Sequence, residues 1–414
     1  MKVVVQKFGG TSVATEDARQ RLVARVKHAM SEGLLVVIVV SAMGRGGEPY
    51  ATDTLIELAR KAHPEPDPRE LDLLMSCGEI ISTVVVSGTL RASGIDSVAM
   101  TGAQAGIFTD GAFGNSRIIR VDPKRIMEEL DRHRTPVVAG FQGTTETGET
   151  TTLGRGGSDI TAVALGASLG ALSVEIFTDV DGIKTADPRV VPHARTIDRM
   201  SYDEISQMAH EGAKVIHPRA VEIAMRHNVP LRIRSTFDDA PGTLVSRTQG
   251  ALAWPESRHY QVVTGITHVT DLCLVSLLNG TGAAPPITSV FRKLAEGGVS
   301  IDMISVSQSD CSFVIKEDVS DRTNRILKSL GLGVDLKRHC AKVSIVGSGM
   351  RGVPGVMANV AEALHDAGVG ILQTSDSHVT ISCLISHDNL HKAAQALHSR
   401  FGLDEASQQR GNQS

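Results

Sequence analysis

Aromatic residues are scarce in this chain of 414 residues, which contains one Trp, three Tyr and nine Phe. So few rings argue against platforms on which nucleic-acid bases stack. An excess of charge of one sign is also lacking, because 42 Lys and Arg nearly balance 46 Asp and Glu, and no long basic run is present. The net charge of −4 argues further against nucleic acid as a partner.

Long hydrophobic runs are missing as well. The longest, residues 34–40, is far shorter than the roughly 20 apolar residues that span a membrane, and the apolar start of the chain is too short for a signal peptide. The five cysteines are scattered without a CxxC pair, which is typical of reduced cytosolic thiols rather than disulfides or zinc ligands. The 15 histidines show no metal spacing such as HExxH. We therefore expect a cytoplasmic protein with no membrane partner and no metal held by protein ligands.

No Walker A sequence is present, yet the first twelve residues, MKVVVQKFGGTS, combine groups that hold polyphosphate. A β-branched run, residues 3–5, leads into Lys7 and the paired glycines Gly9 and Gly10. Glycines let backbone N–H groups approach an anion, Lys7 adds a full positive charge, and a helix start near Thr15 would add its positive end. The segment therefore predicts a phosphate-binding turn that differs from a Walker A loop.

A chain of this length is expected to hold two or three domains. Its first part alternates Val- and Ile-rich strands with helical patterns, which predicts an α/β domain with a mostly parallel sheet sandwiched by helices over residues 1–245. Polar clusters follow Gln6, Val40, Phe141 and Phe177. In such sheets ligands bind beyond the carboxyl ends of the strands, so we expect the site at that edge.

Residues 246–261 lose periodicity and are interpreted as a linker. Beyond them the sequence repeats with a period of 70, as in Val290 and Val360. Each copy follows the order strand, helix, strand, strand, helix, roughly βαββαβ. We predict two ferredoxin-like repeats, over residues 262–335 and 340–405, that pair side by side because neither has a large core alone.

A second glycine-rich turn, TTLGRGGSD over residues 151–159, opens a predicted helix. Arg155 can grip a carboxylate through two parallel hydrogen bonds. Asp159 could organise lysines or a metal-bound nucleotide, although Ser158 or Asp159 could instead only cap the helix. Together with Lys7 and the paired glycines, we interpret this turn as the second half of one site.

Three further positions are ambiguous from sequence. Thr178 and Asp179 follow an apolar strand and could meet a nucleotide, or could only form a tight turn. Glu79 lies within an apolar helix and needs a cationic partner, which is either a substrate ammonium or a basic side chain of a neighbouring helix. Lys214 is either a phosphate ligand or a surface charge.

The segment Gly347–Gly352 reads GSGMRG after a strand and resembles a dinucleotide fingerprint. Only 62 residues follow it, and the first copy of the repeat has no matching glycines. We interpret it as a regulatory loop that binds a small molecule.

Four motifs, KFGGTSV, SAM after the second strand, GRGGSD and TDVDG with TADPR, together resemble the amino acid kinase family, and within it the aspartokinases. The resemblance covers essentially the whole chain, including two C-terminal repeats similar to ACT domains. Residues 44–53 and 375–378 most resemble the diaminopimelate-sensitive aspartokinases I of bacilli. The resemblance implies an amino acid kinase fold that uses ATP and Mg²⁺ to convert L-aspartate into 4-phospho-L-aspartate, the first step toward lysine, threonine, methionine and diaminopimelate.

The resemblance also implies a role for each candidate site residue. Lys7 stabilises the transferring phosphoryl group, and Asp159 orients the catalytic charges. The substrate residues are Ser41 near the reacting end, Glu79 at the ammonium, Arg155 at the α-carboxylate, and Ser158. The nucleotide residues are Lys7, Phe8, Gly9, Gly10, Thr178, Asp179, Lys184, Arg189 and Lys214. Many relatives carry Tyr in place of Lys184.

Similarity to ACT domains implies feedback inhibition by an amino acid bound where repeats of two chains pair, and hence a homo-oligomer, a dimer through these repeats. We expect diaminopimelate as the effector, with lysine or threonine as alternatives, bound near residues 279–288 and 347–355. Alternative functions are another carboxylate or carbamate kinase of the family, a non-catalytic amino-acid sensor, and a nicotinamide-dependent enzyme built on Gly347–Gly352.

Overall fold

The structure is a computed structural model that describes residues 2–213, 215–247, 262–278, 287–307, 310–350 and 352–404. Most of the predicted linker and most of the expected effector segment 279–288 lie outside these residues. The chain divides into two compact units. The first comprises Met1–Ile183, Thr196–Ala209 and Lys214–Ala253, and the second comprises Lys184–Arg195, His210–Ala213 and Trp254–Ser414.

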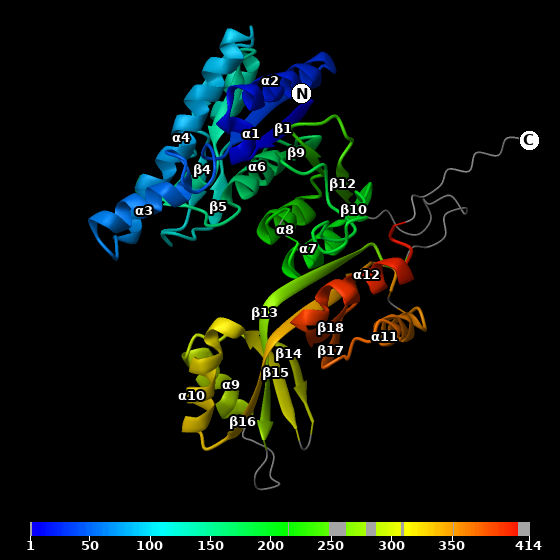
Figure 1. The fold of residues 1–414 in the computed structure, drawn as a ribbon. Coiled ribbons are helices and arrows are strands. Elements are labelled where there is room, and N and C mark those ends of the chain that lie inside the picture. Colours follow the sequence, from blue (N-terminus) through cyan, green and yellow to red (C-terminus); the bar gives the residue numbers. More distant parts are fainter. Residues whose placement is uncertain are drawn as a thin grey trace, which may run out of the picture. The chain divides into compact units, whose positions relative to one another are not determined.

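An eight-stranded sheet forms the centre of the first unit (Figure 1). Its strands, in sheet order, are β10 (Arg199–Ser201), β12 (Thr243–Ser246), β11 (Leu231–Ser235), β9 (Ser173–Thr178), β1 (Val3–Phe8), β2 (Leu35–Val40), β6 (Thr135–Ala139) and β3 (Ser97–Met100). All neighbouring pairs are parallel except β11 and β12. The predicted mostly parallel sheet is confirmed.

The central strands are buried on both faces, which explains their continuous Val and Ile runs. Val4 and Ile38 face one core, where Leu22, Val26 and Leu90 of two helices pack against them. Because strand side chains alternate between faces, the intervening residues of β1 and β2 face the other side of the sheet.

The helices of this unit join the strands and cover the sheet. They are α1 (Gly10–Ala14), α2 (Glu16–Ser31), α3 (Thr52–Ala62), α4 (Pro68–Ala92), α5 (Lys124–Asp131), α6 (Gly157–Ser168), α7 (Tyr202–His210) and α8 (Pro218–His227). α2 and α4 contribute to the core on one face. α6 packs on β1, β9 and β2, and ten of its twelve residues are buried.

Helix α4 is long and apolar enough to cross a membrane by length and composition. However, half of its most apolar stretch is buried inside the protein. It also carries two acidic side chains, Asp72 and Glu79, with 0% and 2% of their surface exposed. We therefore describe α4 as a core helix, which packs against β3, β6 and the smaller sheet of this unit.

That smaller sheet has four short strands, β5 (Ile118–Val121), β4 (Ile107–Thr109), β7 (Gln142–Thr144) and β8 (Thr150–Thr152), in this order. It was not expected from the sequence, because strands of three or four residues show no periodicity. β8 leads directly into the GRGGSD turn.

The second unit is built on a six-stranded sheet. Its strands, in sheet order, are β14 (Asp302–Val306), β15 (Cys311–Lys316), β13 (Gly265–Leu278), β16 (Gly333–Val346), β18 (Thr380–Ser386) and β17 (Gln373–Asp376). All neighbouring pairs are antiparallel. Its helices are α9 (Ile287–Glu296), α10 (Ser320–Ser329), α11 (Val356–Asp366) and α12 (Leu390–Arg400), with short 3-10 turns η1 (Glu317–Val319) and η2 (His387–Asn389).

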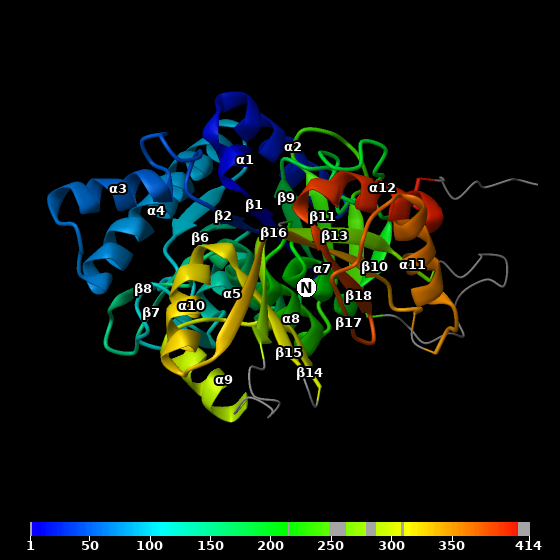
Figure 2. The ribbon, with the colours of Figure 1, turned by 60° about the horizontal axis from the view of Figure 1, so that its bottom comes forward.

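The two long strands β13 and β16 belong to both repeats. Each has a non-glycine residue in the left-handed region near its middle, Asp271 at φ 59° and His339 at φ 57°, where the pairing register shifts. On one side of this bend α9 and α10 cover the first repeat, and on the other α11 and α12 cover the second (Figure 2). Residues 265–269 therefore supply a strand of the second repeat although they precede the first.

Two segments from the first 245 residues pack within the second unit. The carbonyl of Thr185 accepts a hydrogen bond from the N–H of Ile266 at 2.7 Å, and the Thr185 hydroxyl lies 2.9 Å from His398 Nε2. In the other segment, Glu211 forms an ion pair with the buried Lys342 at 2.9 Å. A Cβ on Gly212, at φ 110°, would lie 2.2 Å from the carbonyl oxygen of His268, so only glycine fits there.

Candidate functional site

Lys7 and Asp159 meet at the carboxyl end of the central strand of the first unit. Lys7 is the penultimate residue of β1, and Asp159 lies in the first turn of α6. Their charged groups are 2.7 Å apart, and only 12% and 11% of the two side chains is exposed. An ammonium group has three N–H donors, so the ion pair fixes Lys7 and leaves donors for an anionic ligand.

The paired glycines turn the chain from β1 into α1. A Cβ on Gly10 would lie 2.7 Å from the carbonyl oxygens of both Ala42 and Gly44. Gly10 is therefore required because the loop after β2 approaches closely. A Cβ on Gly9 would lie 3.8 Å from Lys7 Nζ. Gly9 thus keeps the surroundings of the ammonium open.

Glu79 reaches the same loop from α4. Its Oε1 accepts a hydrogen bond from the N–H of Ala42 at 3.0 Å, while its buried Oε2 has no hydrogen-bond partner among the described residues. Ser41, the neighbour of Ala42, is joined to β1 through its N–H, which donates to Phe8 O at 3.1 Å. Burial raises the pKa of Glu79 to about 8, against the smaller effect of the Ala42 hydrogen bond. This carboxylate is ready to receive a cation.

Arg155 lies between two glycines in the left-handed region, Gly154 at φ 74° and Gly156 at φ 69°. A Cβ on Gly154 would lie 2.8 Å from Asn115 Oδ1, and one on Gly156 would lie 2.3 Å from the Cβ of His217. Both glycines are required by conformation and by space. The exposed Arg155 side chain therefore stands on a backbone fixed from both sides.

Ser158 follows this turn and packs against the end of β6. A Cβ on Gly140 would lie 2.7 Å from Ser158 Oγ, and the N–H of Gly140 donates to Val40 O at 3.0 Å. The start of α6 is thereby held against the carboxyl ends of β6 and β2. N-cap side-chain bonding by Ser158, one alternative from the sequence, is not observed, because the N-cap residue is Gly156.

Thr178 and Asp179 follow β9, on the other side of β1. The Thr178 hydroxyl donates to Asp179 Oδ1 at 3.1 Å, and Asp179 also forms an ion pair with Arg45 of the loop after β2. Sequence analysis did not identify Arg45, because one arginine in a glycine-rich loop carries no pattern. The pair adds a second cation near the end of β1.

Three predicted nucleotide residues differ from the others in burial or in unit. The Phe8 side chain is fully buried and stacks on Phe177 with ring centroids 4.7 Å apart, so only its backbone can face a ligand. Lys184 and Arg189 belong to the second unit, where Arg189 forms an ion pair with Asp187 at 2.6 Å. Lys214 lies outside the described residues.

The first glycine of the fingerprint-like segment has a packing role. A Cβ on Gly347 would lie 2.1 Å from the carbonyl oxygen of Val262. Gly355, at φ 90°, is the N-cap of α11. Arg351 lies outside the described residues.

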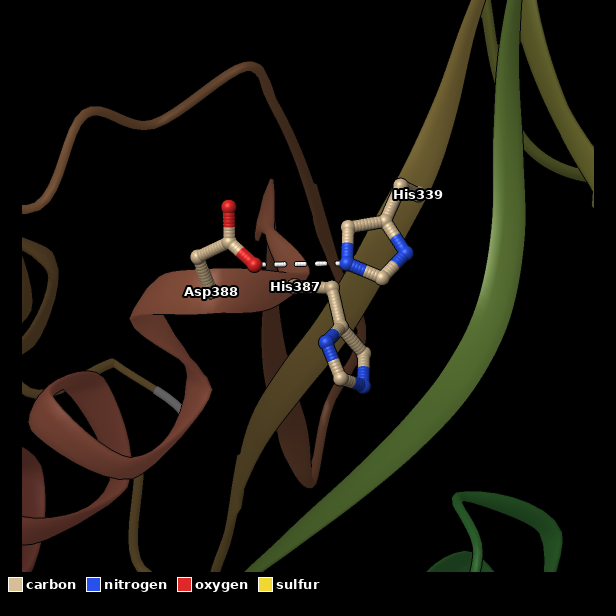
Figure 3. A group of neighbouring side chains, drawn as sticks. All are labelled: His339, His387 and Asp388. Carbon is tan, nitrogen blue, oxygen red and sulfur yellow. Dashed lines mark hydrogen bonds and ion pairs between the residues drawn. The ribbon is translucent and has the colours of Figure 1, made fainter.

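Among the described residues, one group of three could supply metal-binding atoms, and it lies in the second unit (Figure 3). His339 Nε2 lies 3.2 Å from Asp388 Oδ1, and the ring centroids of His339 and His387 are 4.5 Å apart. All three donor atoms lie within 4.8 Å of one another. No pattern in the sequence indicates this group, because His339 is 48 residues from its neighbours and joins them only through strand pairing.

The first-unit site brings a buried lysine, two glycine-rich turns, a buried carboxylate and an exposed arginine to one edge of a parallel sheet. A lysine paired with an acid can neutralise a phosphoryl group. A buried carboxylate suits an ammonium, and an arginine suits a carboxylate. The arrangement therefore fits phosphoryl transfer to an amino acid.

Comparisons with known proteins agree with this arrangement. The profile of the Amino acid kinase family matches residues 2–235, and an ACT domain profile matches residues 335–399. Aspartokinase 1 of Bacillus subtilis is 45% identical over 403 residues, covering 97% of this chain and all of that protein. The aspartokinase of Mycolicibacterium smegmatis is 42% identical over 416 residues, covering 97% of each.

Solved structures give the same result for the fold. E. coli aspartokinase III in complex with aspartate and ADP, in the R-state, superimposes with a TM-score of 0.75 at 26% identity, covering 96% of this chain and 99% of that one. The same enzyme with lysine and aspartate, in the T-state, gives 0.73 at 26% identity, covering 97% and 100%.

Proposed function

The chain belongs to the amino acid kinase family and, within it, to the aspartokinases, and we propose that the site around Lys7 and Asp159 carries its reaction. It is an aspartate kinase under allosteric feedback control. The observation that carries the site assignment is the buried Lys7–Asp159 ion pair at the end of β1. We assign the phosphoryl group of ATP to this pair and the substrate amino acid to the turns beside it.

Three groups match the three charged groups of L-aspartate. Glu79 has an unpartnered buried oxygen suited to the α-ammonium. Arg155 stands on a fixed turn and can hold the α-carboxylate through its fork of donors. Ser41 starts the loop between Glu79 and β1, so it is assigned to the reacting β-carboxylate end.

The chemistry needs no strong base. A β-carboxylate is already ionised at neutral pH, so the acceptor attacks without losing a proton. The rate must then come from alignment and from neutralising charge on the transferring phosphoryl group. Asp159 holds the Lys7 ammonium in place, and the remaining N–H donors of Lys7 bind phosphoryl oxygens as charge develops.

The relative solved with aspartate and ADP supports ATP as the phosphoryl donor. We assign Mg²⁺ to the nucleotide as part of the substrate, because Asp159, the carboxylate that lies at Lys7, is already engaged in its ion pair. Such Mg²⁺ keeps phosphate and water ligands rather than a protein cage.

Regulation and assembly are assigned to the second unit. The relative solved with lysine in its T-state supports an amino acid as the effector, and we favour diaminopimelate, with lysine or threonine as alternatives. β14 is an edge strand that exposes Ile304 and Val306, with 51% and 49% of their surface accessible. An exposed apolar edge invites pairing, which supports a homodimer. The scattered free cysteines support a cytoplasmic location.

The test replaces either member of the buried pair. We expect Lys7→Ala and Asp159→Ala to lower kcat by about 100-fold or more, because transition-state charge stabilisation is lost, while circular dichroism stays native. Product is measured by trapping the acyl phosphate with hydroxylamine. Lys27→Ala, on the exposed face of α2, is the control and keeps normal turnover. Near-normal turnover of either site variant would contradict the assignment.

A further inference from the structure

The turn that carries Arg155 is held from two sides by residues that do not themselves reach the site. On one side stands Asp72 in the first part of α4, and on the other Arg219 in the first turn of α8. They are 147 positions apart in the sequence. What connects them in the fold is the turn segment that each of them contacts. Neither residue is among those expected to bind substrate or nucleotide.

Asp72 holds the end of β8. Its Oδ2 accepts the N–H of Thr152 at 2.8 Å, and its Oδ1 accepts the Thr152 hydroxyl at 2.7 Å. Both oxygens also accept the N–H of Gly114, at 3.0 and 2.9 Å. Because Asp72 is fully buried, these are charge-assisted bonds without competition from water.

Arg219 holds the next residues of the same segment. Its Nη1 donates to Leu153 O at 3.1 Å and to Asn115 Oδ1 at 3.0 Å, and its Nη2 donates to Ser116 O at 3.0 Å. The N–H of Ser116 in turn donates to Thr152 O at 2.9 Å. Asn115 Oδ1 also occupies the space that a Cβ on Gly154 would need.

These bonds form a closed ring that includes Thr152 and Leu153, and Asn115, a member of the ring, packs against Gly154 just before Arg155. We propose that Asp72 and Arg219 are positioning residues that clamp Thr152–Gly154, and so fix where the Arg155 guanidinium meets the α-carboxylate of aspartate. The inference rests on the proposed role of Arg155. It gives Asp72 and Arg219 a function in substrate affinity as well as in stability, because a displacement of about 1 Å at a binding group is enough to lose much of its effect.

Two variants loosen the clamp from opposite sides. Asp72→Asn keeps the size of the side chain, but its NH₂ group must face backbone N–H donors. Arg219→Lys keeps the charge but loses the fork that spans three acceptors. In the full-length enzyme we expect each variant to raise the KM for aspartate about tenfold, while the KM for ATP changes less than about twofold. If Asp72→Asn fails to fold, Arg219→Lys still decides the question.

The matched control is Glu204→Gln in α7. Glu204 is another buried carboxylate that accepts the N–H and the hydroxyl of one residue, Ser201, both at 2.8 Å. We expect it to lower thermal stability without changing the KM for aspartate. If Asp72→Asn and Arg219→Lys behave like this control, the clamp has only a structural role and the proposal is overturned.

Two further measurements separate the clamp from the role of Arg155. Trypsin cleaves after the exposed Arg155, and cleavage there should be faster in both clamp variants, independent of activity. Starting from Arg155→Ala, adding Asp72→Asn should change the aspartate KM by less than about twofold, because the clamp acts through the lost side chain. Faster cleavage with an unchanged KM would show that the turn is clamped but that Arg155 does not bind aspartate. Unchanged cleavage and unchanged KM would overturn the clamp itself.

Discussion

At the scale of single residues, Glu79 combines nearly complete burial with an unpaired charged group. It has 2% of its surface exposed, and one carboxylate oxygen has no hydrogen-bond partner. Among the described residues no lysine or arginine pairs with it, which favours the cation of a ligand as its partner. Burial raises the pKa of Glu79 to about 8. A buried carboxylate without a cationic partner lowers the stability of the protein when it is ionised. We therefore expect a ligand to supply the missing positive charge.

The raised pKa predicts how aspartate binding depends on pH. Below about 8 the free enzyme holds Glu79 protonated, and the substrate ammonium must displace that proton. We therefore expect the KM for aspartate to fall by up to about tenfold per pH unit as pH rises from 6 to 8. Steady-state kinetics at fixed saturating ATP would measure this.

The control for this prediction is Glu79→Gln. It removes the titrating group, so the KM for aspartate should be high and nearly independent of pH over the same range. The effect of pH on protein stability has the opposite sign to its effect on aspartate binding. An acid whose pKa is raised in the folded protein lowers the free energy of unfolding as pH rises from the ordinary pKa of that acid toward about 8. The variant should thus melt higher than the parent at pH 8 and gain less at pH 5. A parallel pH slope in both enzymes would contradict the prediction.

Site residues with a local pattern could be predicted from the sequence, and those defined by distant partners could not. Lys7, Gly9 and Gly10 lie close together in the sequence after an apolar strand, so their combined chemistry could be predicted from the sequence. Asp72 gave no such signal, because its partners lie 42 and 80 residues away and are mostly backbone N–H groups. Every residue except proline has a backbone N–H, so a bond to a backbone donor cannot be predicted from the types of side chain in the sequence.

At the scale of elements, β16 carries a buried charge cluster in the second unit. Lys342 lies 2.9 Å from Glu211 and 2.5 Å from Asp302, with 7% of its side chain exposed. Ser344, two residues along the strand, donates to Glu211 at 2.9 Å. Burial opposes the charge, but the two carboxylates outweigh it and raise the pKa of Lys342. The strand therefore depends on all three charges being present together.

Removing the cation should be costly. We expect Lys342→Met to lower the free energy of unfolding by about 2 kcal/mol, because it leaves the largely buried Glu211 carboxylate without its partner. Urea denaturation followed by circular dichroism would measure it. Adding Glu211→Gln should recover part of the loss. Lys293→Met, which breaks an exposed ion pair with Glu296, is the control and should cost less than about 0.5 kcal/mol. Equal losses in both single variants would refute the buried-cluster account.

The sequence predicted that each repeat opens with a strand, and the structure has β13 and β16 there. It did not predict that each strand continues as part of a 14-residue element. The reason is local, because Asp271 and His339 interrupt the apolar pattern where the strands bend. Polar residues in the left-handed region read as turns in a sequence, whereas here they mark a bend between two continuous halves.

At the scale of the whole molecule, the chain enters the second unit more than once. Lys184–Arg195 and His210–Ala213 belong to it, while the residues on either side belong to the first. The parallel sheet and the repeats were predictable because their periodicities extend over many residues. These two short segments were not, because they lack regular structure and their partners, such as Ile266 and Lys342, lie far along the chain.

Feedback control is a property of the whole molecule, and the effector can be identified by inhibition. We expect meso-diaminopimelate to inhibit more strongly than lysine or threonine, with a coupling free energy of about 1–3 kcal/mol between effector and aspartate. Initial rates with each amino acid, singly and in pairs, would measure it, with leucine as the control. Strong inhibition by lysine alone would contradict the choice of effector.

The shared strands also set an order for synthesis. The half of β13 at residues 265–269 leaves the ribosome before any of its partners in the second repeat exists, since residues 342–346 pair with it only after the whole first repeat has been made. At about 5–20 residues per second that delay lasts several seconds. The first repeat can close during this time, and the early strand must wait unpaired beside it. Slow translation of residues 279–339 would lengthen this exposure, so codon choice in that stretch bears directly on the yield of folded enzyme.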